Sequence, residues 1–217
     1  MNDPNPTAAR EPVVEMPEAP VSWTEIFGNH QSVVLEIGSG KGLFLVNSAR
    51  KNPHLNYLGV EIAKKYAYKA VERIKKADLR NVLMLPGDAR RFLHLFVPER
   101  SVDELHIYFP DPWWKKRHRK RRVFCEEFVL DVARALIPGG DFLMATDVEE
   151  YFQVMMALMA EHPEFIEQPR PEPKLPEHDL DYLTNFERKY RIEGRPIHRA
   201  HYRLNGAANS PSSSQRS

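Results

Sequence analysis

Short apolar runs alternate with helical patterns through the middle of the chain, and this alternation restricts the fold more than any other feature. The runs with the length of buried strands lie at 33–37, 55–60, 82–85, 105–109 and 142–145. The segments with helical periodicity lie at 43–50, 63–77, 124–136 and 151–161. Because strands that alternate with helices form right-handed βαβ units, the sequence predicts an α/β fold with a doubly wound, mostly parallel sheet.

Two parts of this pattern are less regular. The helix that begins at Phe124 is expected to end at Pro138-Gly139-Gly140, since proline and glycine stop helices. The run at 201–204 is expected to add a late antiparallel strand. His106 lies inside a predicted core strand, where a histidine usually has a structural role.

The chain has the size of one domain. Its 217 residues carry a net charge of +1 and 42% apolar residues, which is typical of a globular protein. Residues 1–20 are rich in proline and glutamate and are predicted to be a flexible arm. The domain is expected at 21–204, and the Ser-, Asn- and Gly-rich residues 205–217 are expected to be a disordered tail.

The sequence also indicates a compartment. No segment is long and apolar enough to cross a membrane, and the N-terminal residues lack the apolar core of an export signal. Cys125 is the only cysteine, so no disulfide forms within the chain and a reducing compartment, the cytoplasm, is expected. Cys125 belongs to an apolar helical stripe, which favours packing over nucleophilic chemistry. No cluster has metal-ligand spacing, so no metal site is predicted.

A glycine-rich segment follows the first predicted strand. Gly38-Ser39-Gly40-Lys41-Gly42 has the pattern G-x-G-x-G, whereas a dinucleotide fingerprint needs G-x-G-x-x-G and Leu43 stands at the next position. The pattern therefore argues against a nicotinamide cofactor. It still allows a ligand to approach the backbone and the following helix closely.

Acidic residues close the first three predicted strands. They are Glu36, Glu61 and Asp88. In a doubly wound sheet these strand ends face one crevice, where the acids suit an ammonium group, the hydroxyls of a ribose and the amino group of an adenine. Each acid alone could be only a helix cap or a solvated turn residue. Together with the glycine segment, they predict a site for S-adenosylmethionine.

The fourth predicted strand leads into Phe109-Pro110-Asp111-Pro112-Trp113-Trp114. The prolines fix φ at 110 and 112 and are expected to hold Phe109 and Asp111 extended, in a stiff turn. A basic run, residues 115–122, follows at once. Most charge runs are solvated faces. Here a carboxylate stands beside aromatic rings and cations, a combination that suits an enzyme that modifies a nucleobase.

These segments together resemble the tRNA (guanine-N7-)-methyltransferase family, which has the Rossmann-like fold of class I S-adenosylmethionine-dependent methyltransferases. The resemblance covers residues 30 to 204, and its most specific parts are the Phe109–Trp113 segment, the basic run and Thr184-Asn185-Phe186-Glu187. It implies methylation of N7 of guanine 46 in the variable loop of tRNA, with S-adenosylmethionine as the donor and tRNA as the partner. Trp114 departs from the family, where a smaller or polar residue is common.

The resemblance also implies roles for individual residues. The donor would lie against Glu36, Gly38, Gly40, Gly42, Glu61, Asp88, Ala89 and Asp111. The guanine or nearby RNA would be contacted by Lys115, Asp147, Thr184, Asn185, Phe186 and Glu187. The tRNA backbone would be held by Arg117, His118, Arg119, Lys120, Arg121 and Arg122.

Asp111 is the predicted catalytic residue. Guanine N7 has a lone pair and no proton to lose, so the reaction needs alignment more than a base. Asp111 is expected to accept the guanine N1 and N2 hydrogens and to stabilise the growing positive charge. The alternatives are a methyltransferase for another RNA position or a small molecule, and an RNA-binding protein that has lost catalysis. The basic run argues against a small molecule, and the intact acids argue against loss of catalysis.

Overall fold

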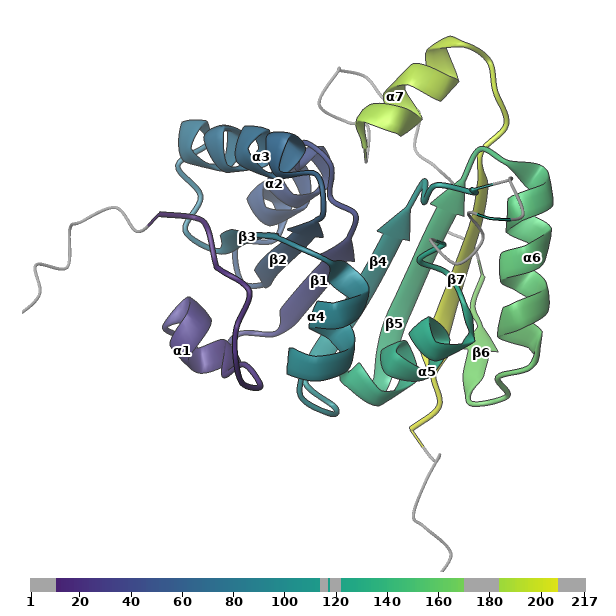
Figure 1. The fold of residues 1–217 in the computed structure, drawn as a ribbon, viewed down its shortest axis with the longest axis horizontal. Coiled ribbons are helices and arrows are strands. Elements are labelled where there is room, and N and C mark those ends of the chain that lie inside the picture. Colours follow the sequence, from purple (N-terminus) through teal and green to yellow (C-terminus); the bar gives the residue numbers. More distant parts are fainter. Residues whose placement is uncertain (1–10, 114–116, 118–121, 170–183, 207–217) are drawn as a thin grey trace, which may run out of the picture.

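The computed structural model describes residues 11–113, 117, 122–169 and 184–206. Among these residues the chain forms one seven-stranded sheet in the order β3-β2-β1-β4-β5-β7-β6 (Figure 1). The strands are β1 (Val33–Ile37), β2 (Asn56–Glu61), β3 (Val82–Pro86), β4 (Val102–Tyr108), β5 (Leu136–Thr146), β6 (Phe165–Glu167) and β7 (His198–Leu204). The first five run parallel, and β7 is antiparallel to β5 and to β6. The predicted doubly wound α/β fold and its late antiparallel strand are confirmed.

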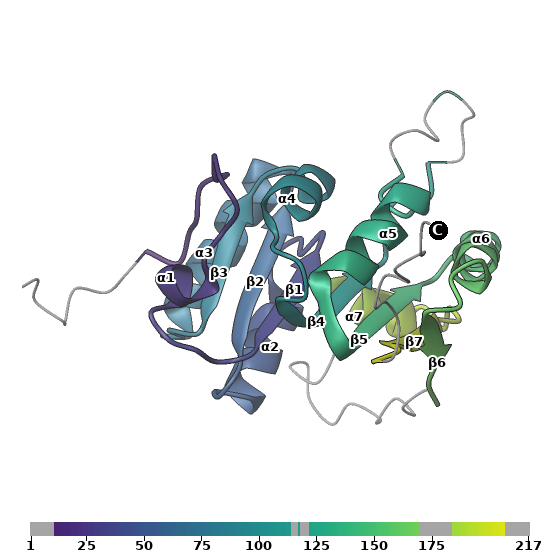
Figure 2. The ribbon, with the colours of Figure 1, turned by 90° about the horizontal axis from the view of Figure 1, so that it is seen from below.

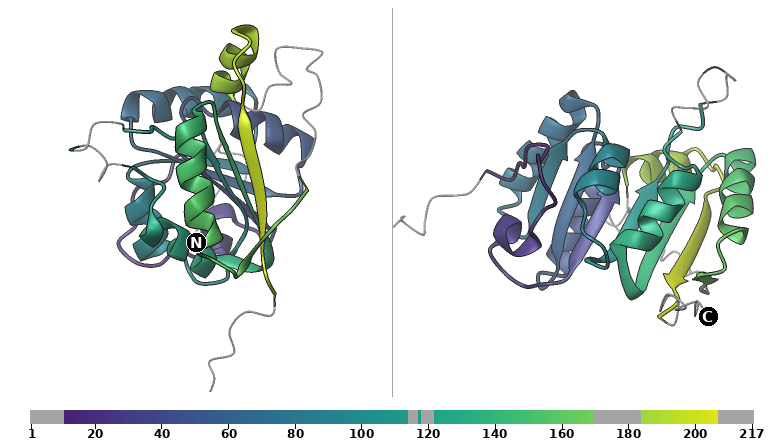
Figure 3. Two further views of the ribbon diagram at one scale, coloured as in Figure 1. Left: turned by 90° about the vertical axis from the view of Figure 1, so that its right-hand side faces the viewer. Right: turned by 60° about the horizontal axis from the view of Figure 1, so that its bottom comes forward.

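Helices cover the two faces of the sheet. On one face α2 (Leu43–Lys51) and α3 (Lys64–Lys76) pack over β1, β2 and β3, and Leu45, Ala70 and Ile74 are fully buried there. On the other face lie α4 (Ala89–Phe96), α5 (Glu126–Ala135) and α6 (Glu149–Ala160), as Figures 2 and 3 show. The short helix α1 (Trp23–Phe27) precedes β1, and α7 (Asn185–Ile192) precedes β7. No helix among the described residues is long and apolar enough to cross a membrane.

The prediction for the segment after α5 was wrong. The helix ends at Ala135, and Leu136 already pairs with Val102 as the first residue of β5. Asp141 pairs with Glu104, so Pro138-Gly139-Gly140 forms a bulge inside the strand and does not cap a helix. Gly139 has φ of 82°, a left-handed conformation that glycine adopts without strain, so it lets the strand bulge and continue.

The N-terminal segment also differs from the expected flexible arm. Residues 1–10 lie outside the described part of the chain, as do residues 207–217. The following residues lie along the free edge of β3. The Val14 amide donates to the Met84 carbonyl at 2.8 Å, and the Met84 amide donates to the Pro12 carbonyl at 3.0 Å. An edge strand presents unpaired backbone groups, and this segment satisfies some of them.

A substitution at Gly59 in β2 tests the packing of α2 on the sheet. A Cβ at this position would lie 2.4 Å from Leu45 Cδ1 and 2.4 Å from Ser39 Oγ. Leu45 is fully buried and has little room to move. Gly59→Ala is therefore expected to lower the free energy of unfolding by about 1–3 kcal/mol, measured by urea denaturation. Gly206→Ala is the control, since its Cβ would meet only Pro138 Cβ at 3.8 Å. Equal stability of the two variants would contradict this account.

Candidate active site

Most of the predicted site residues that the structure describes lie where the parallel strands end. Because β1 to β5 run in the same direction, their carboxyl ends lie along one edge of the sheet, here called the carboxyl edge. The helix α7 stands at this edge, since it leads into β7, whose first residue His198 pairs with Thr146 at the end of β5 (Figure 1). Residues from both halves of the sequence therefore meet here.

The glycine loop between β1 and α2 turns through left-handed conformations. Gly38, Gly40 and Gly42 have φ of 77°, 53° and 70°. The Gly38 amide donates to the Val60 carbonyl at 2.8 Å, which ties the loop to β2. A Cβ at Gly42 would lie 2.8 Å from Ala70 Cβ, whereas a Cβ at Gly38 or Gly40 would meet nothing within 4 Å. Gly42 therefore serves the packing of α2 on α3, and the other two leave open space beside the loop.

Glu61 joins the glycine loop to the start of α3. It is 8% exposed at the end of β2. Its Oε2 accepts a hydrogen bond from the Gly40 amide at 2.9 Å, and its Oε1 accepts one from the Ala63 amide at 2.8 Å. The sequence predicts a ribose contact for this carboxylate, with a helix cap or a solvated turn residue as the alternative. The structure adds an internal role, since the same oxygens hold two backbone segments in place.

Glu36 is a buried carboxylate for which the described part of the chain provides no ion pair. It is 2% exposed, and its Oε2 has no hydrogen-bond partner among the described residues. Burial raises the pKa of Glu36 to about 8; the Ser39 hydroxyl lowers it in part, and the charge of Glu61 raises it further. Burial also raises the pKa of Tyr108, and the charge of Glu36 adds to this. A positively charged group beside Glu36 would stabilise its ionised form. The ammonium of S-adenosylmethionine fits this requirement.

Asp88 caps α4. Its Oδ1 accepts hydrogen bonds from the amides of Arg90 at 2.9 Å and Arg91 at 3.3 Å. Ala89 is the first residue of the helix. The cap that sequence reasoning left open as an alternative is therefore present. The Asp88 side chain is exposed at the end of β3, and its contact with an adenine stays a prediction.

The turn that carries Asp111 is not extended at Phe109 as predicted. Phe109 and Trp113 have φ of 53° and 40°, which is the left-handed region that bulky residues rarely adopt. The Phe109 amide donates to the Ala145 carbonyl at 2.7 Å, so the backbone is still hydrogen-bonded to β5 where it leaves β4. Asp111 itself is exposed. The sequence could not predict the left-handed φ of Phe109. A residue before proline prefers extended geometry, but Phe109 is also hydrogen-bonded to a strand that is distant in the sequence.

The Thr184–Glu187 segment begins α7 as a capping box. The Thr184 hydroxyl accepts from the Glu187 amide at 3.0 Å, and both side chains are buried. Glu187 Oε1 pairs with Arg191 at 2.9 Å and with Arg199. Phe186 is 49% exposed, and Asn185 is the first residue of the helix. Of the residues expected to touch guanine here, Phe186 faces outward while Thr184 and Glu187 also hold the helix together.

Asp147 follows β5 and is paired inside the protein. Its side chain is 8% exposed and forms an ion pair with Arg195, which follows α7. The Arg195 guanidinium lies 4.2 Å from the centre of the Tyr190 ring. Sequence reasoning missed Tyr190 and Arg195. The spacing of Phe186 and Tyr190 by one helical turn was the available signal for the tyrosine.

An aromatic group stands at the carboxyl edge next to Asp111. The ring of Phe109 lies 5.9 Å from that of Phe186 and 5.5 Å from that of Tyr190, and the latter two rings are stacked at 6.1 Å. We call these three residues the aromatic shelf. It joins the end of β4 to α7, which follows it by more than seventy positions in the sequence.

Of the basic run, residues 115–122, the structure describes Arg117 and Arg122. Trp114, Lys115 and Lys116 lie outside the described residues, as do the members His118, Arg119, Lys120 and Arg121. Arg117 is described and exposed. Arg122 is half-buried, and its Nε donates to the Pro112 carbonyl at 2.7 Å.

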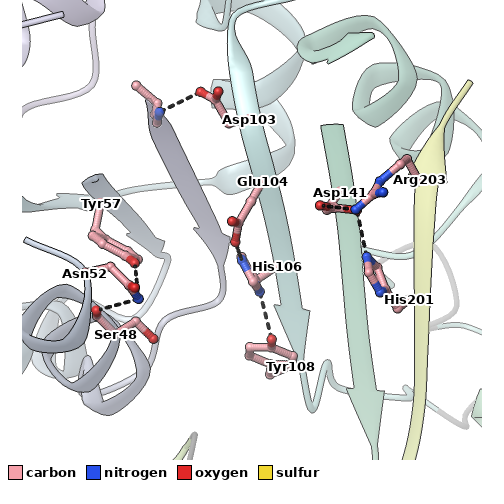
Figure 4. A network of polar contacts seen from close by, with 11 residues as sticks. Ser48, Asn52, Tyr57, Asp103, Glu104, His106, Tyr108, Asp141, His201 and Arg203 are labelled. Carbon is pink, nitrogen blue, oxygen red and sulfur yellow. Dashed lines mark hydrogen bonds and ion pairs between the residues drawn. The ribbon is translucent and has the colours of Figure 1, made fainter. Parts of the chain in front are cut away.

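His106 has the structural role that was expected. It is 4% exposed in β4, and its ring nitrogens lie 2.7 Å from the Tyr108 hydroxyl and 3.0 Å from Glu104 Oε2 (Figure 4). The hydrogen bond with His106 lowers the pKa of Glu104. Figure 4 also shows Asp141 of β5 with His201 and Arg203 of β7. The contacts of His106 lie within β4, whereas those of Asp141 connect β5 to β7.

The burial of Glu36 predicts a pH dependence of stability. Its folded-state pKa of about 8 lies above the ordinary value of 4.5, so its contribution to stability is complete below pH 4.5 and is lost as pH rises through about 8. Glu36→Gln should therefore gain stability relative to the wild type as pH rises, by an amount on the order of a few kcal/mol. Urea denaturation of both proteins across this range measures the difference. Glu25→Gln, at an exposed position, is the control. A difference that stays constant with pH would contradict the assignment.

Solved structures with a similar fold are methyltransferases. The 16S rRNA methyltransferase KamB has a TM-score of 0.62 and 19% identity, covering 84% of this chain and 92% of that chain. The aminoglycoside resistance methyltransferase NpmB1 has a TM-score of 0.58 and 17% identity, covering 83% of this chain and 90% of that chain. At such identities the likeness concerns the fold alone.

Sequence relatives are more specific. A family model described as "Putative methyltransferase" matches residues 30–200. A tRNA (guanine-N(7)-)-methyltransferase of Rhodopirellula baltica is 41% identical over 212 residues, 94% of this chain and 78% of that protein. One of Geobacter metallireducens is 34% identical over 184 residues, 85% of this chain and 87% of that protein. With the glycine loop, the buried acids and the Asp111 turn at one edge of the sheet, the chain belongs to the tRNA (guanine-N7-)-methyltransferase family.

Proposed function

We propose that this protein methylates N7 of guanine 46 in the variable loop of tRNA, and that it works in the cytoplasm. The observation that carries the proposal is the meeting of two unlike surfaces at the carboxyl edge. One holds Glu36, a buried carboxylate that no cation among the described residues pairs with, and the other holds the exposed Asp111 and Phe186. The first suits a cationic donor and the second suits a nucleobase. Membership of the family supports the choice of tRNA and of guanine N7.

The donor of this family is S-adenosylmethionine, which supplies a methyl group on a sulfonium. Glu36 would bind its ammonium group, because this carboxylate is buried and gains a cation. Gly38 and Gly40 would allow the ligand to approach the loop, where a Cβ would meet nothing within 4 Å. Glu61 would accept ribose hydroxyls with the lone pairs that Gly40 and Ala63 leave free. Asp88 and Ala89 would meet the adenine.

The aromatic shelf and Asp111 would hold the guanine. Phe186 is 49% exposed and offers a face on which a base can stack. Asp111, on the adjoining turn, would accept the N1 and N2 hydrogens of the base. Its negative charge would then stabilise the purine as it becomes positive, without removing a proton. Asp147 and Glu187 would act on the guanine side by holding Arg195 and α7 in place, in addition to any direct contact with the base.

An Asp111→Asn variant tests this role. The amide keeps the shape of the side chain but removes its charge, so the single-turnover rate of methyl transfer should fall by about 10²-fold or more. Mapping N7-methylguanosine in tRNA treated with the wild type should identify position 46. Asp78→Asn is the matched control, since Asp78 is an exposed aspartate that pairs with Arg80 at 3.4 Å. Methylation at another position, or a wild-type rate for Asp111→Asn, would contradict the proposal.

The basic run is proposed to hold tRNA phosphates, and salt dependence tests this. Replacing Arg117, Arg119 and Arg121 by alanine should flatten the salt dependence of tRNA binding by about one unit of slope for each charge removed. Donor affinity should stay the same. A control with alanine at Arg80 and Arg100 removes exposed arginines that precede β3 and β4, away from the carboxyl edge. An unchanged slope in the triple variant would identify the run as a solvated face.

A further inference from the structure

We propose that Arg122 is a positioning residue that clamps the Asp111 turn onto Tyr151, and that it is separate from the cations of the basic run that meet tRNA. Sequence reasoning grouped Arg122 with those cations. The inference rests on the proposed role of Asp111, because a clamp on this turn matters for catalysis only if Asp111 acts there.

Arg122 already has partners within the protein. Its Nε donates a hydrogen bond to the Pro112 carbonyl at 2.7 Å, directly after Asp111. Its guanidinium carbon lies 5.1 Å from the centre of the Tyr151 ring, within the range of a cation–π contact. Tyr151, in α6, is fully buried. The guanidinium therefore connects the exposed turn to a side chain that the core holds rigidly.

The described residues of the turn can donate few backbone hydrogen bonds. Pro110 and Pro112 have no amide hydrogen to donate. Phe109 and Trp113, at the two ends of the turn, both adopt left-handed conformations that are unfavourable for bulky residues. The Phe109 amide holds the first end through the Ala145 carbonyl. Arg122 holds the other end through Pro112, so Asp111 lies between two anchors.

Tyr151 lies close enough to the turn for the charge of Asp111 to raise its pKa. Burial raises the pKa of Tyr151 to about 12; the Arg122 guanidinium and the Phe124 amide oppose this, and the charges of Cys125 and Asp111 add to it. This agrees with the geometry, in which Arg122 lies between the buried ring and the turn. The Tyr151 ring is the platform for the guanidinium, so the contribution of its hydroxyl is expected to be small.

Lysine can replace arginine on a phosphate but not in this clamp. A lysine ammonium keeps the positive charge, whereas only the planar guanidinium can stack on a ring while its Nε donates to a carbonyl. Arg122→Lys therefore separates the two roles. If Arg122 met tRNA mainly as a charge, the lysine variant would bind and react almost normally.

The experiment compares Arg122→Lys, Tyr151→Leu and Tyr151→Phe. The first two should speed amide hydrogen exchange of the 105–113 segment in donor-free protein and should slow single-turnover methyl transfer, each by about tenfold, because Asp111 loses its alignment. Tyr151→Phe keeps the ring and should stay near the wild type in exchange. The salt dependence of tRNA binding should be unchanged in all three.

Arg134→Lys is the matched control. Arg134 is another half-buried arginine, and it donates to the Val97 carbonyl at 2.7 Å, close to the amino end of β4. It should lose stability without faster exchange in the 105–113 segment.

Three results would overturn the clamp. The first is wild-type exchange and rate in Arg122→Lys. The second is a flatter salt slope in Arg122→Ala that Arg122→Lys restores, which would identify a phosphate contact. The third is faster exchange in Arg134→Lys to the same extent, which would indicate general loosening. A wild-type rate for Asp111→Asn together with faster exchange in Arg122→Lys would overturn the role of Asp111 and leave the clamp in place.

Discussion

The donor side of this protein depends on the two hydrogen bonds that Glu61 accepts. They come from the Gly40 and Ala63 amides and join the glycine loop to the start of α3. The Gly38 and Ser39 amides tie the start of the loop to the Val60 carbonyl of β2, and the bond from the Gly40 amide to Glu61 fixes the loop further along. The arrangement brings a second carboxylate, Glu36, close to the first in a buried place. Since no cation from the described residues pairs with Glu36, a cationic ligand beside it would stabilise its ionised form.

The acceptor side is built differently. It depends on two ion pairs that join α7 and the segment after it to the sheet. Glu187 of α7 pairs with Arg199 of β7, and Asp147 after β5 pairs with Arg195 after α7, while Arg191 pairs with Glu187 inside the helix. Glu187 is 3% exposed, and the ionised form of a carboxylate buried to this degree is costly unless a cation pairs with it. The same pairs orient Tyr190 and Phe186 towards Phe109, which creates the aromatic shelf. The glycine loop with Glu61 and the α7 region with the aromatic shelf therefore lie at the same edge of the sheet. Backbone hydrogen bonds hold the first in place, and ion pairs and ring contacts hold the second.

The parallel direction of most strands could be predicted because their short apolar runs alternate regularly with helical patterns. The glycine loop and the acids at 36, 61 and 88 were found for the same reason, since each follows a clear strand. Short elements escaped prediction. The helix α4 and the strand β6 have too few residues for a periodic signal. Leu136 and Phe109 were misjudged because pairing with Val102 and with Ala145 overrode the local preference of proline and glycine neighbours.

By itself, the sequence determined the fold class, the place of the donor loop and the presence of a carboxylate turn beside a basic run. These depend on local periodicity and on spacing along the chain. Only the tertiary structure decided which charged residues of these motifs have partners inside the protein. Arg122, Asp147 and Glu187 belong to motifs that suggest RNA contacts, yet each is joined to a partner from another element. The neighbouring sequence is the same whether a charged side chain contacts RNA or pairs within the protein. Its role depends on whether the fold places an aromatic ring or an opposite charge close to it.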